Sequence, residues 1–215
     1  MTGPVKDRPL QLTQGDLAHI GALVTRAQKG DREAFDALVD LYTPQVYNLA
    51  LRVTGSREEA EDCVQDAFVR AFCALRSFRG EAAFSTWLYR VALNVATDAA
   101  RKRARIPLAA SELASEDGGE PPPELDRLAR GAATDSHGPE VAFLAKQRRQ
   151  TVLKAIRHLP DHQRAVVILY DLQGLSYEEI AHILKTRIGT VKSRLNRARL
   201  ALRDLLAADL ELLRG

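Results

Sequence analysis

Apolar residues recur with helical spacing along almost the whole chain, but this spacing is lost between residues 106 and 139. That stretch holds Gly118, Gly119 and consecutive prolines at 121–123, among many Ser, Asp and Glu residues. Such a composition favours a flexible segment, extended around the prolines, because it buries too little apolar surface to form a core. On either side the sequence shows no strand alternation of useful length. The sequence therefore predicts an all-α protein in which two small helical domains are joined by a flexible linker.

The same pattern sets the expected boundaries. Residues 1–15 are polar and contain proline, and we expect a disordered N-terminus there. The first helical domain is expected over residues 16–105, the linker over 106–139, and the second helical domain over 140–213. A chain of 215 residues is long enough for two cores of this size.

Within the first domain, helices are expected from Asp16, after Gly30, from Arg57 to Leu75, and from Thr86 to Arg105. Pro44 either begins an additional helix or kinks the one that starts after Gly30. Two further details are expected. Ser56 and Glu59 have the spacing of a capping box. Leu17 and Phe72 are expected on the apolar faces of their helices, which turn toward the core.

The two cysteines, Cys63 and Cys73, lie in one expected helix, about 15 Å apart along its axis, which is too far for a disulfide. Free thiols fit a reducing compartment. No apolar run approaches the ~20 residues needed to span a bilayer, and the N-terminus lacks the apolar core of a signal peptide. We therefore expect a cytoplasmic protein with no direct membrane insertion.

Residues 174–195 have the pattern of a helix-turn-helix. Ser176 and Glu179 form a capping box for a short first helix. Residues 185–189 fit a tight turn before the second helix. The apolar residues expected to hold the two helices together are Ile180, Ile188, Val191 and Leu195.

The second helix of this motif presents polar side chains of the types that contact duplex DNA. We call them the basic face: Thr190, Lys192, Ser193, Asn196 and Arg197. Arg reads guanine edges, Asn reads adenine, and Lys or Ser binds phosphates. The helix carries several further basic residues and no acidic residue before Asp204. A solvated, salt-bridged helix is the alternative, but like charges on one face are costly without an anion, which favours DNA.

Aromatic and basic residues interleave between Leu75 and Arg105, a combination that suits unstacked nucleotides. Phe84 and Trp87 fit a buried core equally well, because aromatic residues at helical spacing often pack inward. The candidate nucleic-acid-binding residues in this segment are Phe78, Arg79, Tyr89 and Asn94.

A third polar surface, the acidic face, consists of Asp62, Gln65 and Asp66. By itself such a face is typical of a solvated helix surface.

Patterns for enzymatic chemistry are missing from the sequence. The five histidines show no metal-ligand spacing, and no phosphate-binding loop of the G-x-x-x-x-G-K-[ST] kind occurs. We expect no catalytic residue, no metal and no cofactor. Two other classes of protein remain as alternatives: a free-standing helix-turn-helix regulator that binds operator DNA as a dimer, and a nucleic-acid enzyme with clustered acidic metal ligands.

The order of these segments resembles the extracytoplasmic-function (ECF, group IV) RNA polymerase sigma factors of the sigma-70 family. The matching stretches are residues 30–35, 60–68, 77–80 with 84–90, and 175–199, and the resemblance extends over residues 17–213. It implies that the first domain is sigma region 2 and the second is sigma region 4. The implied function is to direct core RNA polymerase to promoters and to promote strand opening, often in a stress response.

The resemblance also implies a role for each polar surface. The acidic face corresponds to the contact with the β′ coiled coil of core polymerase, and region 4 to the contact with the β flap. The aromatic and basic candidates correspond to the surface that receives a flipped base of the −10 element. The basic face corresponds to the contact with the −35 element. Many members of the family are also held inactive by an anti-sigma factor.

Overall fold

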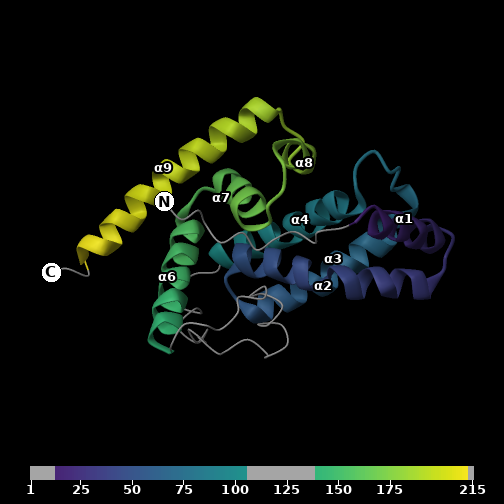
Figure 1. Cartoon of the computed structure of the whole chain (residues 1–215), viewed down its shortest axis with the longest axis horizontal. Coiled ribbons are helices and arrows are strands. Elements are labelled where there is room, and N and C mark those ends of the chain that lie inside the picture. The colour runs from purple at the N-terminus through teal and green to yellow at the C-terminus, as the bar shows by residue number, and fades with distance from the viewer. Residues whose placement is uncertain (1–12, 106–138, 213–215) are drawn as a thin grey trace. The chain divides into compact units, whose positions relative to one another are not determined.

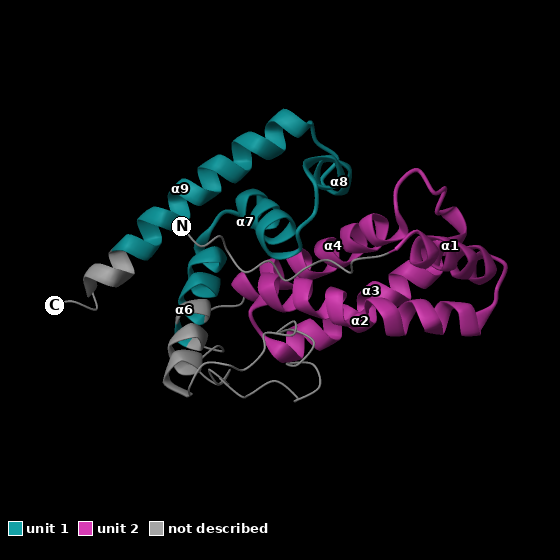
Figure 2. Ribbon diagram, viewed as in Figure 1, with its two compact units in different colours: residues 1–7, 130–215 teal, residues 8–129 magenta. Residues whose placement is uncertain are grey.

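The computed structural model describes residues 13–105 and 139–212 (Figure 1). These residues form two compact units, one containing α1 to α4 and the other α6 to α9 (Figure 2). All regular elements in the described ranges are helical, so the predicted all-α fold class is confirmed. Most of the expected disordered N-terminus (residues 1–12) and of the expected linker (residues 106–138) lies outside the described residues.

The first unit is built from α1 (Gln14–Gln28), α2 (Arg32–Thr54), α3 (Arg57–Ala74), the 3-10 turn η1 (Leu75–Ser77) and α4 (Phe84–Ala104). Helices α2, α3 and α4 pack against one another, and α1 lies mainly against α2. The largest fully buried side chains of this unit are Leu38, Tyr42, Val46, Leu49, Leu75 and Leu88. Burial of this apolar surface is the main force that holds the four helices together.

Pro44 does not begin a separate helix, because it lies inside α2, which runs from Arg32 to Thr54. The expectation of an additional helix there was wrong. A proline inside a helix lacks the N–H that would bond to the carbonyl one turn earlier. Tyr42 and Val46, on either side of Pro44, are 1% and 0% exposed, so tertiary burial holds this segment helical.

Helix α3 begins at Arg57 as expected, but the caps at the helix starts of the first unit differ from the expected ones. Helix α1 begins at Gln14, where Thr13 and Asp16 form a complete capping box that the sequence reasoning missed. At the start of α3, the Glu59 N–H donates to Ser56 Oγ at 3.4 Å, which is one half of the expected box. The Glu59 carboxylate instead lies 3.6 Å from Arg103 Nη1 on α4. The Glu59 carboxylate thus pairs with Arg103 of the neighbouring helix α4, in place of the Ser56 backbone N–H that a capping box would give it.

Several apolar residues that were expected to face inward are exposed. Leu17 is 47% exposed and Phe72 is 49% exposed, with the Phe72 ring edge-on to Phe35 at 5.0 Å. In the second unit Ile188 is 39% exposed. Each lies at the margin of its helix's apolar stripe, and these stripes are wider than the surface that the neighbouring helices cover.

The second unit contains α6 (Pro139–His158), α7 (Asp161–Val167), the π-helical turn η3 (Ile168–Leu172), α8 (Tyr177–Ile183) and α9 (Ile188–Leu212). Helix α9 packs against α6, α7 and α8. The core is formed by fully buried aliphatic side chains: Ile156, Leu159, Val166, Ile168, Leu169 and Ile180. Helix α9 therefore depends on three other helices for its position.

Both cysteines are free thiols, Cys63 buried and Cys73 exposed, as the sequence predicted. Of the helices in the described ranges, none has the length and apolar character required to cross a bilayer. The same ranges contain no group of three or more His, Cys, Asp or Glu residues placed to hold a metal ion.

Candidate nucleic-acid interface

Helices α8 and α9 form the predicted helix-turn-helix. The Ser176 N–H donates to Glu179 Oε2 at 2.8 Å, and the Glu179 N–H donates to Ser176 Oγ at 3.2 Å, so the expected capping box is complete. Ile180, Val191 and Leu195 are at most 3% exposed between the two helices. This apolar contact fixes the short α8 against the long α9.

The turn between these helices contains one residue with strained backbone. Lys185 has a φ of 49°, in the left-handed region that a side chain disfavours. The Thr186 N–H donates to the Ala181 carbonyl oxygen at 3.0 Å, which closes the end of α8. The tight turn that the sequence predicted is therefore present, with its strain concentrated at Lys185.

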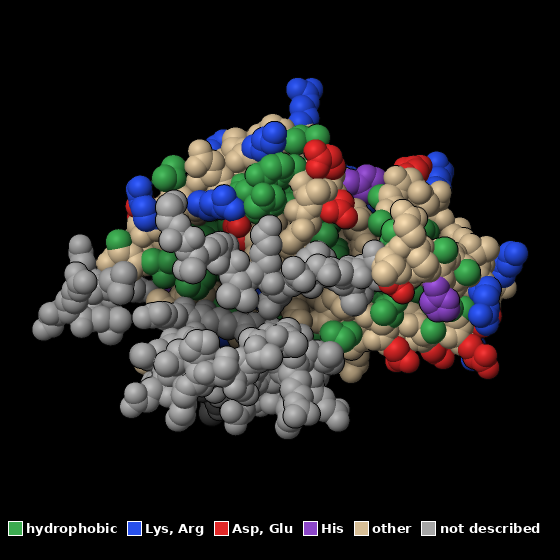
Figure 3. Space-filling model, viewed as in Figure 1, with side chains coloured by type: hydrophobic (Ala, Val, Ile, Leu, Met, Phe, Trp, Pro, Cys, Tyr) green, Lys and Arg blue, Asp and Glu red, His purple; other side chains and the backbone are tan. Residues whose placement is uncertain are grey.

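The basic face lies on the first turns of α9. Lys192, Ser193, Asn196 and Arg197 are exposed, and Thr190 is half-buried. Figure 3 shows basic side chains recurring on the surface over α9. The structure thus brings these five predicted residues together on one solvent-facing stretch of helix.

Two other basic residues of α9 are paired with acids. Arg199 Nη2 lies 2.5 Å from Asp171 Oδ1, on the preceding turn η3, and this pairing raises the pKa of Arg199. Arg203 Nη2 lies 2.8 Å from Asp204 Oδ1. Helix α9 carries no acidic residue before Asp204, as the sequence indicated, but Asp171 approaches Arg199 from another element. The case for DNA binding therefore depends on the basic face itself.

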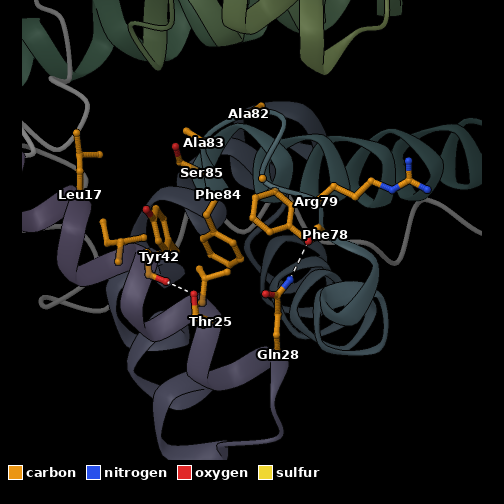
Figure 4. Close-up of a pocket in the computed structure, with 14 residues that line it drawn as sticks. Leu17, Thr25, Gln28, Tyr42, Phe78, Arg79, Ala82, Ala83, Phe84 and Ser85 are labelled. Carbon is orange, nitrogen blue, oxygen red and sulfur yellow. Dashed lines mark hydrogen bonds between the residues drawn. The ribbon is translucent and has the colours of Figure 1, made fainter.

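In the first unit, a surface pocket of about 360 Å³ opens between α1, Tyr42 of α2 and residues 78–85 (Figure 4). Phe78, Arg79 and Phe84 contribute to its lining. The Arg79 side chain extends away from the group formed by Phe78, Phe84 and Tyr42. Two of the predicted residues therefore border a pocket. The ring of Phe78 lies with the other aromatic rings of the lining, and the Arg79 side chain extends away from them.

Gln28 at the end of α1 holds the start of the 78–85 segment. Its amide Nε2 donates to the carbonyl oxygens of Leu75 at 3.1 Å and Phe78 at 2.8 Å. Figure 4 shows the second of these bonds beside the pocket. The sequence reasoning missed Gln28, and no local pattern distinguishes it from any other polar residue near a helix end.

An aromatic cluster supports the floor of this pocket. Phe84 lies 5.6 Å from Trp87 and 5.4 Å from Tyr42, and Phe78 lies 5.2 Å from Trp87, between ring centroids. Phe84 is 6% and Trp87 8% exposed, so the core interpretation holds for both. Burial raises the pKa of Tyr42 to about 12, and its hydroxyl stays protonated at neutral pH.

The other two candidates of this segment lie apart from the pocket on α4. Tyr89 is 5% exposed and packs in the core, so its ring is not presented to a base. Asn94 is exposed on α4, outside the buried stripe of that helix. It is not part of the pocket lining.

The acidic face is exposed on α3: Asp62, Gln65 and Asp66 all face solvent. Cys63 lies beneath it, and burial, together with the nearby carboxylates of Glu59, Asp66 and Asp62, raises the pKa of its thiol to about 11. The face is therefore a concentrated negative surface above an un-ionised buried thiol.

The sequence matches two families of known proteins. Residues 38–106 match sigma-70 region 2, and residues 149–202 match sigma-70 region 4. The chain is 40% identical over 182 residues to the RNA polymerase sigma-H factor of Pseudomonas aeruginosa, covering 84% of this chain and 90% of that protein. It is 41% identical over 186 residues to the ECF RNA polymerase sigma-E factor of Escherichia coli K12, with the same coverage. The chain belongs to the ECF sigma factors of the sigma-70 family.

Solved structures agree with the assignment of this chain to the sigma factors. CnrH in complex with the cytosolic domain of CnrY matches with a TM-score of 0.62 and 26% identity over 89% of this chain and 99% of that chain. The sigma factor RpoE of Bartonella quintana, solved with the anti-sigma factor NepR, matches with a TM-score of 0.58 and 28% identity over 81% of this chain and 98% of that chain. The protein is a sigma factor that directs RNA polymerase to promoters.

Proposed function

We propose that this sigma factor binds promoter DNA at two separate surfaces, one on each unit, while it is bound to core RNA polymerase. Residues 16–105 act as region 2, which binds the −10 element and promotes strand opening. Residues 140–213 act as region 4, which binds the −35 element as duplex. The polymerase fixes the spacing of the two units, and the tether between them raises the effective concentration of the second contact.

The −35 contact is made by the basic face of α9. Side chains near the start of a recognition helix reach base edges when that helix enters the major groove. Arg197 and Asn196 supply groups for base edges, and Lys192 and Ser193 supply groups for phosphates. The observation that supports this contact is the exposure of these four side chains on consecutive turns of α9.

The −10 contact is made at the pocket beside Phe78. Extruding a base from the duplex costs a few kcal/mol. Stacking on an aromatic ring is worth ~1–3 kcal/mol per base, and polar groups at the base edge add to this. At the pocket, Phe78 offers the ring and Arg79 a polar contact. Asn94, exposed on α4 apart from the pocket, offers a further polar contact to the extruded strand. Tyr89 is left out of this contact because it is buried.

The acidic face of α3 docks on a basic part of the β′ coiled coil, and the α6–α9 unit docks on the β flap. An anti-sigma factor is a further partner, as for RpoE of Bartonella quintana, which was solved with NepR. The protein acts in the cytoplasm and supplies no catalytic group, because the polymerase performs the chemistry.

Transcription from duplex and pre-melted promoters tests this division of labour. The template is a genomic fragment selected by the wild-type holoenzyme, and it is compared with a version containing a mismatched bubble at the −10 element. Asn94→Ala is expected to slow opening on the duplex and to recover on the bubble. Arg197→Ala is expected to weaken promoter binding about 5- to 150-fold on both templates, because one bidentate base contact is worth ~1–3 kcal/mol.

Two matched variants serve as controls. Arg203→Gln removes an α9 charge that is already paired with Asp204, and Asp98→Asn changes an exposed α4 residue one turn beyond Asn94. Neither is expected to alter transcription. Equal recovery of Asn94→Ala and Arg197→Ala on the bubble would contradict the proposed division.

A further inference from the structure

Four side chains on the surface of the α6–α9 unit form a continuous column. The rings of Tyr170 and Tyr177, the tyrosine stack, lie parallel, 4.7 Å apart between centroids with an interplanar angle of 7°. Arg199 Cζ lies 5.4 Å from the Tyr170 centroid, and Lys192 Nζ lies 5.4 Å from the Tyr177 centroid. The order along the column is Arg199, Tyr170, Tyr177, Lys192.

The column ties together three consecutive elements of the chain. Tyr170 comes from η3, Tyr177 begins α8, and both cations come from α9. Lys192 and Arg199 are seven residues apart, so they lie on one face of α9, about 10.5 Å apart along its axis. Both cations therefore approach the two rings from the same face of α9.

The two cations differ in their remaining interactions. Arg199 is neutralised by Asp171, whose carboxylate it contacts through both Nη2 and Nε. Lys192 is exposed, and within the described ranges its contact is with the Tyr177 ring face. A ring face attracts a cation without cancelling its charge, so the Lys192 ammonium remains able to bind an anion.

The Tyr177 hydroxyl keeps its proton at neutral pH. A hydrogen bond between the Tyr170 and Tyr177 side chains, and partial burial, raise the pKa of Tyr177. With its hydroxyl protonated, Tyr177 contacts the Lys192 ammonium through its ring face and does not form an ion pair with it.

We propose that the tyrosine stack positions Lys192 for a backbone phosphate of the −35 duplex, with the Arg199–Asp171 pair anchoring the far end of the column. Tyr177 and Tyr170 are positioning residues that act through Lys192. This inference rests on the proposed function of α9 as the helix that reads duplex DNA.

The test measures equilibrium binding of the reconstituted holoenzyme to a duplex promoter fragment selected by the wild-type holoenzyme, over a range of salt concentrations. Loss of one phosphate contact reduces the slope of log K against log salt by about 0.9. Lys192→Met and Tyr177→Leu are both expected to reduce the slope by about this amount and to weaken binding about threefold to tenfold at low salt. Tyr177→Phe keeps the ring and is expected to keep the wild-type slope.

A double variant separates positioning from general damage. Tyr177→Leu combined with Lys192→Met is expected to lose no more than either single variant, since both remove the same contact. Circular dichroism of each variant shows whether it is folded. If Tyr177→Leu does not fold, Lys192→Met in the otherwise native protein still decides the outcome, because an unchanged slope for that exposed substitution overturns the proposal.

A third variant distinguishes failure of this inference from failure of the proposed function. If Arg197→Ala weakens binding while Tyr177→Leu keeps the wild-type slope, α9 reads DNA and the positioning role is wrong. If neither Arg197→Ala nor Lys192→Met changes binding, the proposed function of α9 fails and this inference fails with it. Arg203→Gln is expected to match the wild type throughout.

Discussion

The α1–α4 unit and the α6–α9 unit both use aromatic rings beside a candidate DNA-binding surface, but they hold those rings differently. In the first unit, Phe84 and Trp87 are buried and continuous with the core under the pocket. In the second, Tyr170 and Tyr177 are only half-buried and stack between charged side chains. Apolar burial is nearly independent of salt, whereas exposed charge interactions are screened by it. The geometry of the second surface should therefore respond more strongly to ionic strength.

The units also differ in how their helices are stabilised. Both units contain long helices, α2 with 23 residues and α4 with 21 in the first, α6 with 20 and α9 with 25 in the second. The second unit also contains α7 and α8, which have only seven residues each. Helices of seven residues are unstable alone in water and depend on caps and on packing. Local interactions at helix ends therefore matter more in the α6–α9 unit.

The largest expected effect tests whether the two units are energetically separate. Leu88 on α4 and Leu169 in η3 are both 0% exposed. Leu88→Ala and Leu169→Ala are each expected to cost about 2–5 kcal/mol through lost burial and a residual cavity. Native-state hydrogen exchange in dilute denaturant should show each loss only in peptides of the substituted unit. Equal loss of protection in both units from either variant would mean that they unfold together.

A smaller effect is expected at Gln28, which holds the loop beside the pocket. Gln28→Leu removes two hydrogen bonds and leaves the Leu75 and Phe78 carbonyl groups without this donor, at a cost of about 1–3 kcal/mol. Faster hydrogen exchange in residues 78–83 would show that the loop has lost these two hydrogen bonds. Unlike the effect of Tyr177→Leu, this one should not change with salt, and a clear salt dependence would contradict the contrast between the units. Lys29→Gln, at the exposed neighbouring position, is the control.

The caps of α8 and α3 give a third comparison. Ser176 belongs to a complete capping box, and Ser56 belongs to half of one. Ser176→Ala is expected to lower the free energy of unfolding of its unit by about 1 kcal/mol, and Ser56→Ala to lower that of its unit by about half as much. Denaturant titrations followed by exchange in each unit measure both. The comparison fails if Ser56→Ala proves the costlier substitution.

An effect of similar small size, but of opposite sign, is expected at Lys185. Lys185 has a φ of 49° in the turn of the helix-turn-helix, and glycine adopts that conformation without steric cost. Lys185→Gly is expected to raise the free energy of unfolding of the α6–α9 unit by about 0.5–1 kcal/mol. Lys185→Ala removes the same charge but retains the strain, so it should show no gain in the same thermal unfolding experiment.

Several interactions within one or two helical turns were predictable from the sequence, although the Thr13 capping box was missed and the Ser56 box is only half formed. The helix-turn-helix, the Ser176 capping box and the exposure of Arg197 follow from residue types at fixed short spacings. Asp62 and the rest of the acidic face were likewise placed on the outer side of α3 by periodicity alone. These features depend on backbone geometry that every α-helix shares.

Contacts between elements were not predictable in this way. The bonds from Gln28 to the Leu75 and Phe78 carbonyl groups span 47 and 50 residues, and the bond from Arg199 to Asp171 spans 28. The burial of Tyr89 likewise depends on which face of α4 its neighbours cover. Spacing along one helix says nothing about which residue another helix brings opposite.

The sequence by itself determined the helical class, the family and the helix on which each polar surface lies. Only the tertiary structure decided that Arg199 pairs with Asp171 while Lys192 lies over the Tyr177 ring, and that Phe78 borders a pocket while Tyr89 does not. The reason is that secondary structure follows from local periodicity, whereas the charge and accessibility of a side chain depend on the packing of the whole unit.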